Sequence, residues 1–329
     1  MPSQVRPARG IRSFCCGKIV HSLADMRDMT NSGFKRVSLD DLSLPTITHR
    51  AADLFEVALD DWSQFHPAIA KLETINQEIA DTADLGSTKW LFRGQADSEW
   101  AVVSALERFA PLIKTLEEYY SHAHSPRYVI ESATGEKWDI RSPHDFNSAL
   151  QNAAMVPLVF NARPDEYAYL VYLRHHGFPS PLVDWTRSPY VAAFFAYSNA
   201  FQQSNERVAV FAYLEATGRG KLTSPGSPTI YSLGPYTRTA PRHYIQQAEY
   251  TICLRTQGGD GHHAICGHAE AFARRESSQD VLIKFTLPRS EWRRALSYLD
   301  QHNMNAHTLY GSVDRLMETM AVREMLLSV

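Results

Sequence analysis

The residue types best suited to chemistry gather in residues 174–197, RHHGFPSPLVDWTRSPYVAAFFAY. Gly177 and the prolines after it end a preceding helix, and the apolar residues around Asp184 predict a short buried strand. Ser188 followed by Pro189 predicts the N-cap and the first residue of a new helix. Polar groups between these two elements lie beside a helix N-terminus, which favours anions. Asp184 therefore either belongs to a binding site or only braces the turn.

Two more charged residues stand at the ends of predicted strands. Arg93 follows the apolar run KWLF, and Glu249 precedes the run YTICL. Strand ends hold side chains rigidly, so we expect the segments at 93, 184–188 and 246–249 to meet in one cleft.

The positions of the apolar residues predict the elements that carry these groups. Helical spacing predicts helices over residues 50–80, from 104 toward 120, over 144–158, 165–176 and 309–327, and from about 290. Apolar runs predict strands over residues 89–92, 182–185, 208–214, 229–233, 250–254 and 281–285. Residues 121–145 are expected to be a break, and residues 1–45 an irregular lead-in. Helices first and strands later predict an α+β fold, with mixed or antiparallel sheets flanked by helices.

The composition narrows the classes of protein. The chain has 329 residues, 44% of them hydrophobic, which is ordinary for a globular protein with a substantial core. A net charge of −3 argues against binding to nucleic acid or to an anionic membrane through the overall charge of the protein. No apolar stretch is long enough to span a membrane or to act as a secretory signal, and the four cysteines show no disulfide spacing. We therefore expect a cytoplasmic protein without a membrane partner.

Residue types that bind metals are concentrated in the segment GGDGHHAICGHAE. They are His262, His263, Cys266, His268 and Glu270. Their spacing is not the pair of ligand doublets that structural zinc sites use. We expect a polar surface loop here without a metal, and a metal-dependent hydrolase is the alternative that we rank last.

Three motifs, in order, resemble those of the FRG domain family, which is named after a phenylalanine-arginine-glycine motif. They are Phe92-Arg93-Gly94-Gln95 with Trp100 after it, residues 175–196, and residues 242–251. Residues 297–300 and 307–316 are similar to the family's closing segment, so the resemblance covers about residues 90–316. It implies that residues 46–329 form an FRG domain with a helical N-terminal part. Glu249 departs from the family, which usually has an apolar residue at that position.

A more distant similarity is to ADP-ribosyltransferases, and it implies that NAD is a substrate. That family has a basic residue at the end of its first strand, a serine or threonine before an alanine-rich helix, and a late glutamate. The matching residues imply catalysis by Glu249, Arg93 and Gln247. Contacts to NAD are implied for Arg93, Thr186, Ser188, Asp184, Tyr190 and His175. The similarity also implies an ADP-ribosyltransferase-like core.

These residue types suit cleavage of the bond between nicotinamide and ribose. The sugar becomes cationic in the transition state, so a fixed carboxylate such as Glu249 lowers the barrier. Arg93 suits a pyrophosphate because its planar fork donates two parallel hydrogen bonds, and the helix N-terminus at Ser188 suits a phosphate. The alternative for Arg93 is a buried ion pair with Asp184 that holds two strands together.

The sequence leaves the acceptor and the class of function open. Transfer of ADP-ribose to water would make the protein an NAD glycohydrolase, and a protein, a nucleic acid or a small molecule would be other acceptors. A role as a bacterial toxin or defence effector, with a cognate antitoxin or partner protein, also agrees with the resemblance. The alternative is a nucleotide or nucleic-acid binding module without turnover. Its arginines and aromatic residues either stack on bases or fill the core: Trp90, Phe92, Arg93, Trp100, Trp185, Arg187, Arg242 and Tyr244.

Overall fold

A computed structural model describes residues 34–48, 54–82, 89–153, 155–200, 205–215, 226–235, 237–256, 261–273 and 280–327. Within these ranges, nine strands form one sheet in the order β1-β2-β9-β5-β3-β4-β7-β6, and β8 pairs with β7. The strands are β1 (Lys35–Arg36), β2 (Leu54–Ala58), β3 (Trp90–Gln95), β4 (Val183–Thr186), β5 (Arg207–Leu214), β6 (Thr229–Ser232), β7 (Ala248–Thr256), β8 (His263–Ile265) and β9 (Val281–Pro288). The pairs β1–β2 and β2–β9 are parallel and the other pairs are antiparallel. The sheet is therefore mixed.

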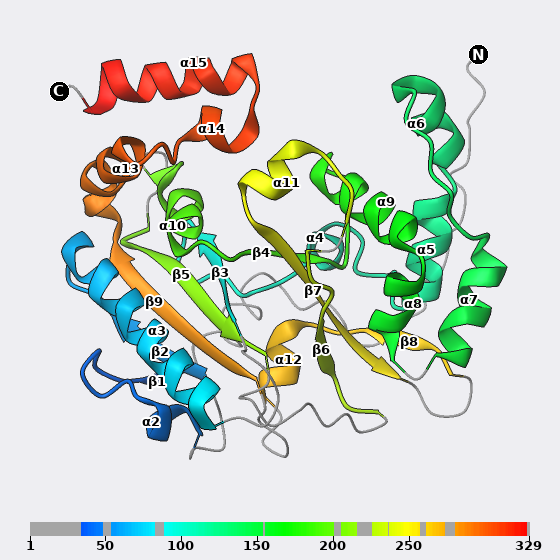
Figure 1. Cartoon of the computed structure of the whole chain (residues 1–329), viewed down its shortest axis with the longest axis horizontal. Coiled ribbons are helices and arrows are strands. Elements are labelled where there is room, and N and C mark those ends of the chain that lie inside the picture. Colours follow the sequence, from blue (N-terminus) through cyan, green and yellow to red (C-terminus); the bar gives the residue numbers. More distant parts are fainter. Residues whose placement is uncertain are drawn as a thin grey trace, which may run out of the picture.

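Helices flank this sheet in two groups (Figure 1). The group on the β9 side comprises α3 (Phe65–Thr82), α10 (Pro189–Tyr197) and α13 (Trp292–Gln301). The group on the β7 side comprises α5 (Leu116–His124), α6 (Arg127–Thr134), α7 (Pro143–Asn152), α8 (Val156–Ala162) and α9 (Pro164–His175). The remaining α-helices are α2 (Leu44–Thr48), α4 (Ala105–Phe109), α11 (Pro241–Ile245), α12 (His268–Ala273), α14 (Ala306–Tyr310) and α15 (Val313–Ala321). The prediction of an α+β fold with a helix-flanked sheet is confirmed.

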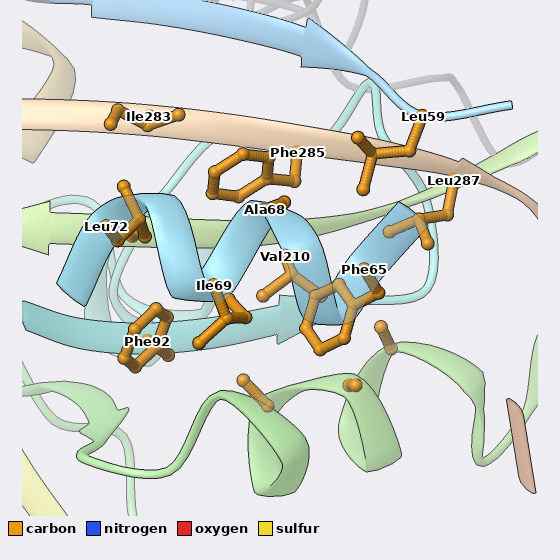
Figure 2. Packing of buried hydrophobic residues seen from close by; sticks show 14 of the residues in the cluster. Leu59, Phe65, Ala68, Ile69, Leu72, Phe92, Val210, Ile283, Phe285 and Leu287 are labelled. Carbon is orange, nitrogen blue, oxygen red and sulfur yellow. The ribbon is translucent and has the colours of Figure 1, made fainter. Parts of the chain in front are cut away.

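The largest hydrophobic core lies between the sheet and the first group of helices. Figure 2 shows side chains of α3, among them Phe65, Ile69 and Leu72, packed with Val210 of β5 and Phe285 of β9. A second core joins β7 to α5, α7, α8 and α9. A third core lies on the opposite face of the sheet and is closed in part by α12. The two faces of β7 therefore have different neighbours.

Gly94 allows β3 and α10 to approach each other closely. A Cβ atom at Gly94 would lie 1.8 Å from the carbonyl oxygen of Ala192, so no other residue fits without a shift of the backbone. Ser188 accepts a hydrogen bond from the Val191 N–H and caps α10, as predicted, with Pro189 at its first position. The glycine of the Phe-Arg-Gly motif thus has a packing role beside the helix that Ser188 begins.

Four predicted helices have different bounds in the structure. The one predicted over 144–158 is divided into α7 and α8, and the one predicted over 309–327 is divided between α14 and α15. Residues 54–58 form strand β2, and the helix predicted over 50–80 begins only at Phe65. The apolar run LFEVA fits the spacing of a helix as well as the alternation of a strand. In the structure it alternates, with Phe55 and Val57 buried on one face and Leu54 packed on the other. The capping box at Ser104 is confirmed, but the helix that it opens ends at Phe109. A second N-cap at Thr115 then starts α5.

Two segments predicted to be irregular contain helices or strands. Helix α6 lies within 121–145, and the segment predicted to be a polar loop contains β8 and the start of α12. Residues 1–33 of the predicted lead-in lie outside the described residues, whereas 34–48 contain β1 and α2. Among the helices of the described residues, none is long and apolar enough to cross a membrane. The ADP-ribosyltransferase-like core stays a prediction.

Candidate functional site

The three predicted motifs lie on adjacent strands, with β4 between β3 and β7. Asp184 and Thr186 of β4 are opposite Tyr250 and Ala248 of β7. Strand β3 pairs with β4 at one position, Phe92 with Thr186. Beside that pair, Arg93 Nη1 donates to the carbonyl oxygen of Asp184 at 2.8 Å. The Arg93 side chain therefore bonds to the main chain of β4 at the point where β3 and β4 stop pairing.

A cleft of about 340 Å³ opens at this place. Its walls come from β3, β4, β7, the end of α9, α10, α11 and the end of α14. The lining residues are Phe92, Arg93, Gly94, Arg174, His175, Asp184, Trp185, Thr186, Phe195, Arg242, Gln246, Ala248, Tyr250 and Tyr310. All three motifs contribute to this one cleft, which confirms that they meet.

The cleft carries more positive than negative charge. Arg93, Arg174 and Arg242 line it, and Asp184 is the one carboxylate among the lining residues. Asp184 pairs with Arg174 through Oδ2, so the predicted alternative of a buried pair between Arg93 and this carboxylate is not what forms. Burial lowers the pKa of Arg93 to about 10, an effect that the nearby Asp184 opposes, so Arg93 stays charged at neutral pH. Burial also lowers the pKa of Arg242.

Several polar atoms of these side chains are buried and have no hydrogen-bond partner. They are Nε of Arg93, Nε of Arg174, Nε and Nη2 of Arg242, and Oδ1 of Asp184. A buried polar group without a partner costs about 1–3 kcal/mol, and more when it is charged. Such groups are rare in native proteins, and where several lie together a water or a ligand can complete their hydrogen bonds.

A chain of hydrogen bonds runs along one wall of the cleft. The Tyr250 hydroxyl lies 2.6 Å from His175 Nε2 and 3.2 Å from His243 Nδ1. His243 Nε2 lies 3.3 Å from the carbonyl oxygen of Pro235. Burial lowers the pKa of His175 to about 4, with a further contribution from Arg242, so this histidine is neutral at pH 7. Its Nδ1 atom is buried and has no partner.

A family model for the FRG domain matches residues 88–205. The chain contains an FRG domain. This matched stretch, which is less than half of the chain, supplies Arg93, Arg174, His175 and Asp184 to the cleft. No curated protein and no solved structure matches the chain.

The predicted site residues of the FRG domain divide into two sets. Arg93, His175, Asp184 and Thr186 line the cleft, although the Thr186 hydroxyl is already used, donating to Gln246 O and accepting from the Ser188 N–H.

Ser188 and Tyr190 do not line the cleft. The Ser188 hydroxyl is engaged as the N-cap of α10. The Tyr190 hydroxyl lies 2.6 Å from His66 Nδ1, on the side of α10 that packs against α3. Both residues stabilise α10, and their predicted contacts to NAD stay predictions.

Glu249 and Gln247, which follow the matched stretch, also lie off the cleft. Side chains alternate along a strand, so Glu249 faces away from Ala248 and Tyr250, which line the cleft. Glu249 is buried and forms an ion pair with Arg187. Gln247 has a left-handed backbone, φ 48°, at the corner where α11 meets β7. The catalytic roles of both residues stay predictions, and the carboxylate in the cleft is that of Asp184.

Sequence reasoning did not assign Arg242, Tyr250, Phe195 or Tyr310 to a catalytic or NAD site. Arg242 and Tyr250 lie in the third predicted motif, and alternation from Ala248 places Tyr250 on the same strand face. Tyr310 has no such local signal, because α14 reaches the cleft only through the tertiary fold. The side chain of Gln246 donates to the carbonyl oxygen of Leu309 at 2.9 Å and ties α11 to α14.

The metal-ligand types of residues 262–270 contact other residues, and His262 and His263 both lie near Glu117 Oε1. His263 bonds to Glu117, His268 to Thr251, and Glu270 to Arg255. Among the described residues, no group of three or more histidine, cysteine, aspartate or glutamate side chains could hold a metal ion.

Proposed function

We propose that the cleft binds a nucleotide through its phosphates and that the bound nucleotide is NAD. The observation that carries this proposal is the set of three arginines that line the cleft, Arg93, Arg174 and Arg242, each with a buried N–H group that has no acceptor. Guanidinium groups donate to phosphate oxygens in a geometry that matches the anion, so a diphosphate satisfies several of these donors together. The volume of about 340 Å³ lies within the range of small-ligand sites, at its lower end.

Two aromatic side chains support a nucleotide rather than a bare phosphate. The rings of Phe195 and Tyr310 line the cleft with centroids 6.2 Å apart, in an edge-to-face arrangement. Such rings offer flat surfaces on which a base or a nicotinamide stacks.

We propose further that the protein is an NAD-dependent ADP-ribosyltransferase or NAD glycohydrolase in which Asp184 faces the reacting ribose. Oδ1 of Asp184 is buried and unpartnered, while Oδ2 is held by Arg174. A carboxylate fixed in this way stabilises a cationic sugar more in the transition state than in the ground state.

Calorimetric titration with NAD, ADP-ribose, ADP and adenosine tests the binding. The three diphosphates are expected to bind and adenosine is not, because it lacks the group that the arginines recognise. Arg242→Gln is expected to weaken ADP-ribose binding on the order of ten- to a hundredfold, through the loss of charge-assisted hydrogen bonds. The matched control is Arg255→Gln, since Arg255 pairs with Glu270 and does not line the cleft. Equal affinity of the two variants for ADP-ribose would show that the cleft arginine Arg242 does not bind the phosphates.

Release of nicotinamide from NAD tests the chemistry. Asp184→Asn is expected to keep ADP-ribose binding and to lower nicotinamide release on the order of a hundredfold or more, because the amide carries no charge. Binding of NAD without release by the wild type would instead support the second candidate, a nucleotide-binding module without turnover. Exposed Trp100 and Tyr244 would then be available to stack on a longer nucleic acid.

A role as a toxin or defence effector is proposed on the family resemblance alone. Depletion of NAD arrests growth, so inducible expression in bacteria is expected to lower cellular NAD and colony formation. Asp184→Asn is the matched control. Equal toxicity of this variant and the wild type would show that toxicity does not depend on the chemistry of the cleft.

A further inference from the structure

The direction of each hydrogen bond along the Tyr250 wall follows from its ends. The carbonyl oxygen of Pro235 only accepts, so His243 Nε2 carries a proton and donates to it. Burial lowers the pKa of His243, so this histidine is neutral and its Nδ1 is a bare acceptor. The hydroxyl proton of Tyr250 therefore points to His243 Nδ1.

This direction fixes the tautomer of His175. The Tyr250 hydroxyl has one proton, and once it is donated to His243 the oxygen only accepts from His175. At 2.6 Å the donor is His175 Nε2–H. Neutral His175 then has its lone pair on Nδ1, which is buried and without a partner beside a cleft that His175 lines.

From this geometry we propose that His175 is the general base of the cleft and that the acceptor of ADP-ribose is a neutral hydroxyl group. Tyr250 and His243 are positioning residues, because they act only by holding His175 in the Nε2–H tautomer. The proposal rests on the proposed function for its reaction, although the tautomer does not depend on it.

The step balances without a further reactant. The bond between the nicotinamide nitrogen and the ribose carbon breaks, and its electron pair leaves with nicotinamide, which becomes neutral. The acceptor oxygen forms the new bond to the ribose carbon, and its proton moves to His175 Nδ1. The imidazolium formed is disfavoured first by burial and then by the positive charge of Arg242, so it returns this proton to solvent once the products leave.

The charge of the cleft selects this class of acceptor. Three arginines line it, so a lysine or arginine side chain would meet like charge on entry. A carboxylate acceptor has no proton to lose at neutral pH and would not use a base. A hydroxyl fits both conditions, whether it belongs to water, a sugar or an alcohol side chain.

Nitrogen-15 NMR of histidine-labelled, ligand-free protein reads the tautomer directly. The His175 signals are assigned by their loss in His175→Gln. The proposal expects the proton on Nε2 in the wild type, and a mixture of tautomers in Tyr250→Phe. The matched control is Tyr167→Phe, because that side chain is also largely buried and its hydroxyl donates to Gly234 O rather than to a histidine. A proton on Nδ1 in the wild type, as when Nδ1 donates to another group, would overturn the proposal.

The rate of transfer to methanol tests the role as a base. Nicotinamide release, methyl ADP-riboside and ADP-ribose are measured together, so that transfer to an alcohol and to water are separated. His175→Gln is expected to lower both products about a hundredfold or more while ADP-ribose binding is kept. Tyr250→Phe is expected to lower them about tenfold and Tyr167→Phe hardly at all. A wild-type rate in folded His175→Gln would overturn the base, whereas no nicotinamide release by the wild type would overturn the proposed function.

Discussion

Two buried arginine clusters in this protein differ in whether their polar atoms have partners. The first joins Arg141 to Glu166, which is fully buried and accepts from Arg141 Nε at 2.7 Å and from the Arg141 N–H at 2.8 Å. Arg141 Nη2 also donates to Val159 O, and neither residue has a buried polar atom without a partner. In the cleft, Arg93, Arg174, Arg242 and Asp184 all have such atoms.

On the proposed function, this difference separates charges that stabilise the fold from charges that bind a ligand. A buried ion pair whose donors and acceptors are satisfied holds elements together and needs nothing else. A group of buried donors that lack acceptors is stable only because the surrounding fold holds it, as is common at binding sites. Burial of charge alone would have marked both clusters, whereas the partners of each atom distinguish them.

The largest expected effect is on stability, at the satisfied cluster. Arg141→Met leaves the Glu166 carboxylate buried and unpaired, so the free energy of unfolding is expected to fall by about 3–5 kcal/mol. Urea unfolding measures this loss. The double variant with Glu166→Met is expected to recover part of it, because no charge is then left buried. A loss below about 1 kcal/mol would mean that the satisfied cluster has no structural role.

The second effect is on the pH dependence of stability, at the cleft. The pKa of His175 is about 4 in the folded protein, compared with the ordinary value of 6.5 in the unfolded chain. As the pH falls, the unfolded chain therefore takes up a proton before the folded protein does. The contribution of neutral His175 is complete above pH 6.5 and is lost between pH 6.5 and 4. It amounts to at most on the order of 3 kcal/mol.

Urea unfolding at several pH values compares the wild type with His175→Gln. The wild type should lose more stability than the variant between pH 6.5 and 4. His243 is present in both proteins and shares the Tyr250 hydroxyl with His175, so the difference between the curves reports His175 together with its effect on His243. Parallel curves would show that His175 is not shielded from protonation by the fold.

The parts of the fold that depend on neighbouring residues could be predicted from the sequence. The caps at Ser104 and Ser188 are confirmed because a serine side chain and the N–H three residues later are enough to define them. Strand β2 was predicted as helix because Leu54 and Val57 are three residues apart, which also fits a helical period. Its pairing with β1 and with β9, which is far along the chain, decides between the two.

The same limit applies to the candidate site. Motif order brought Arg93, Asp184 and the start of β7 together, as the strand order β3-β4-β7 confirms. The sequence did not show which face of β7 would meet the cleft, and this choice separates Tyr250 from Glu249. Tyr310 reaches the cleft through α14, which no local pattern connects to β7.

A third effect is expected to be small on stability and large on binding. Arg242→Met removes buried donors that have no acceptor in the ligand-free protein, so its free energy of unfolding should change by less than about 1 kcal/mol or rise slightly. Affinity for ADP-ribose should fall nonetheless. Unfolding and titration of the same variant check both parts. A stability loss like that of Arg141→Met would place the two clusters in one class.

The smallest effect is expected at Glu249, which belongs to neither cluster. Its carboxylate is buried but pairs with Arg187, whose side chain is 36% exposed, so Glu249→Gln should lower stability by only about 1 kcal/mol. Because Glu249 faces away from Tyr250 and the cleft, nicotinamide release should stay within about threefold of the wild type, compared with a hundredfold loss for Asp184→Asn. Side-by-side rates of the two variants decide which carboxylate serves the reaction. If Glu249→Gln keeps ADP-ribose binding but loses release, Glu249 is the stabilising carboxylate that the sequence predicts, and β7 must turn this face to the substrate.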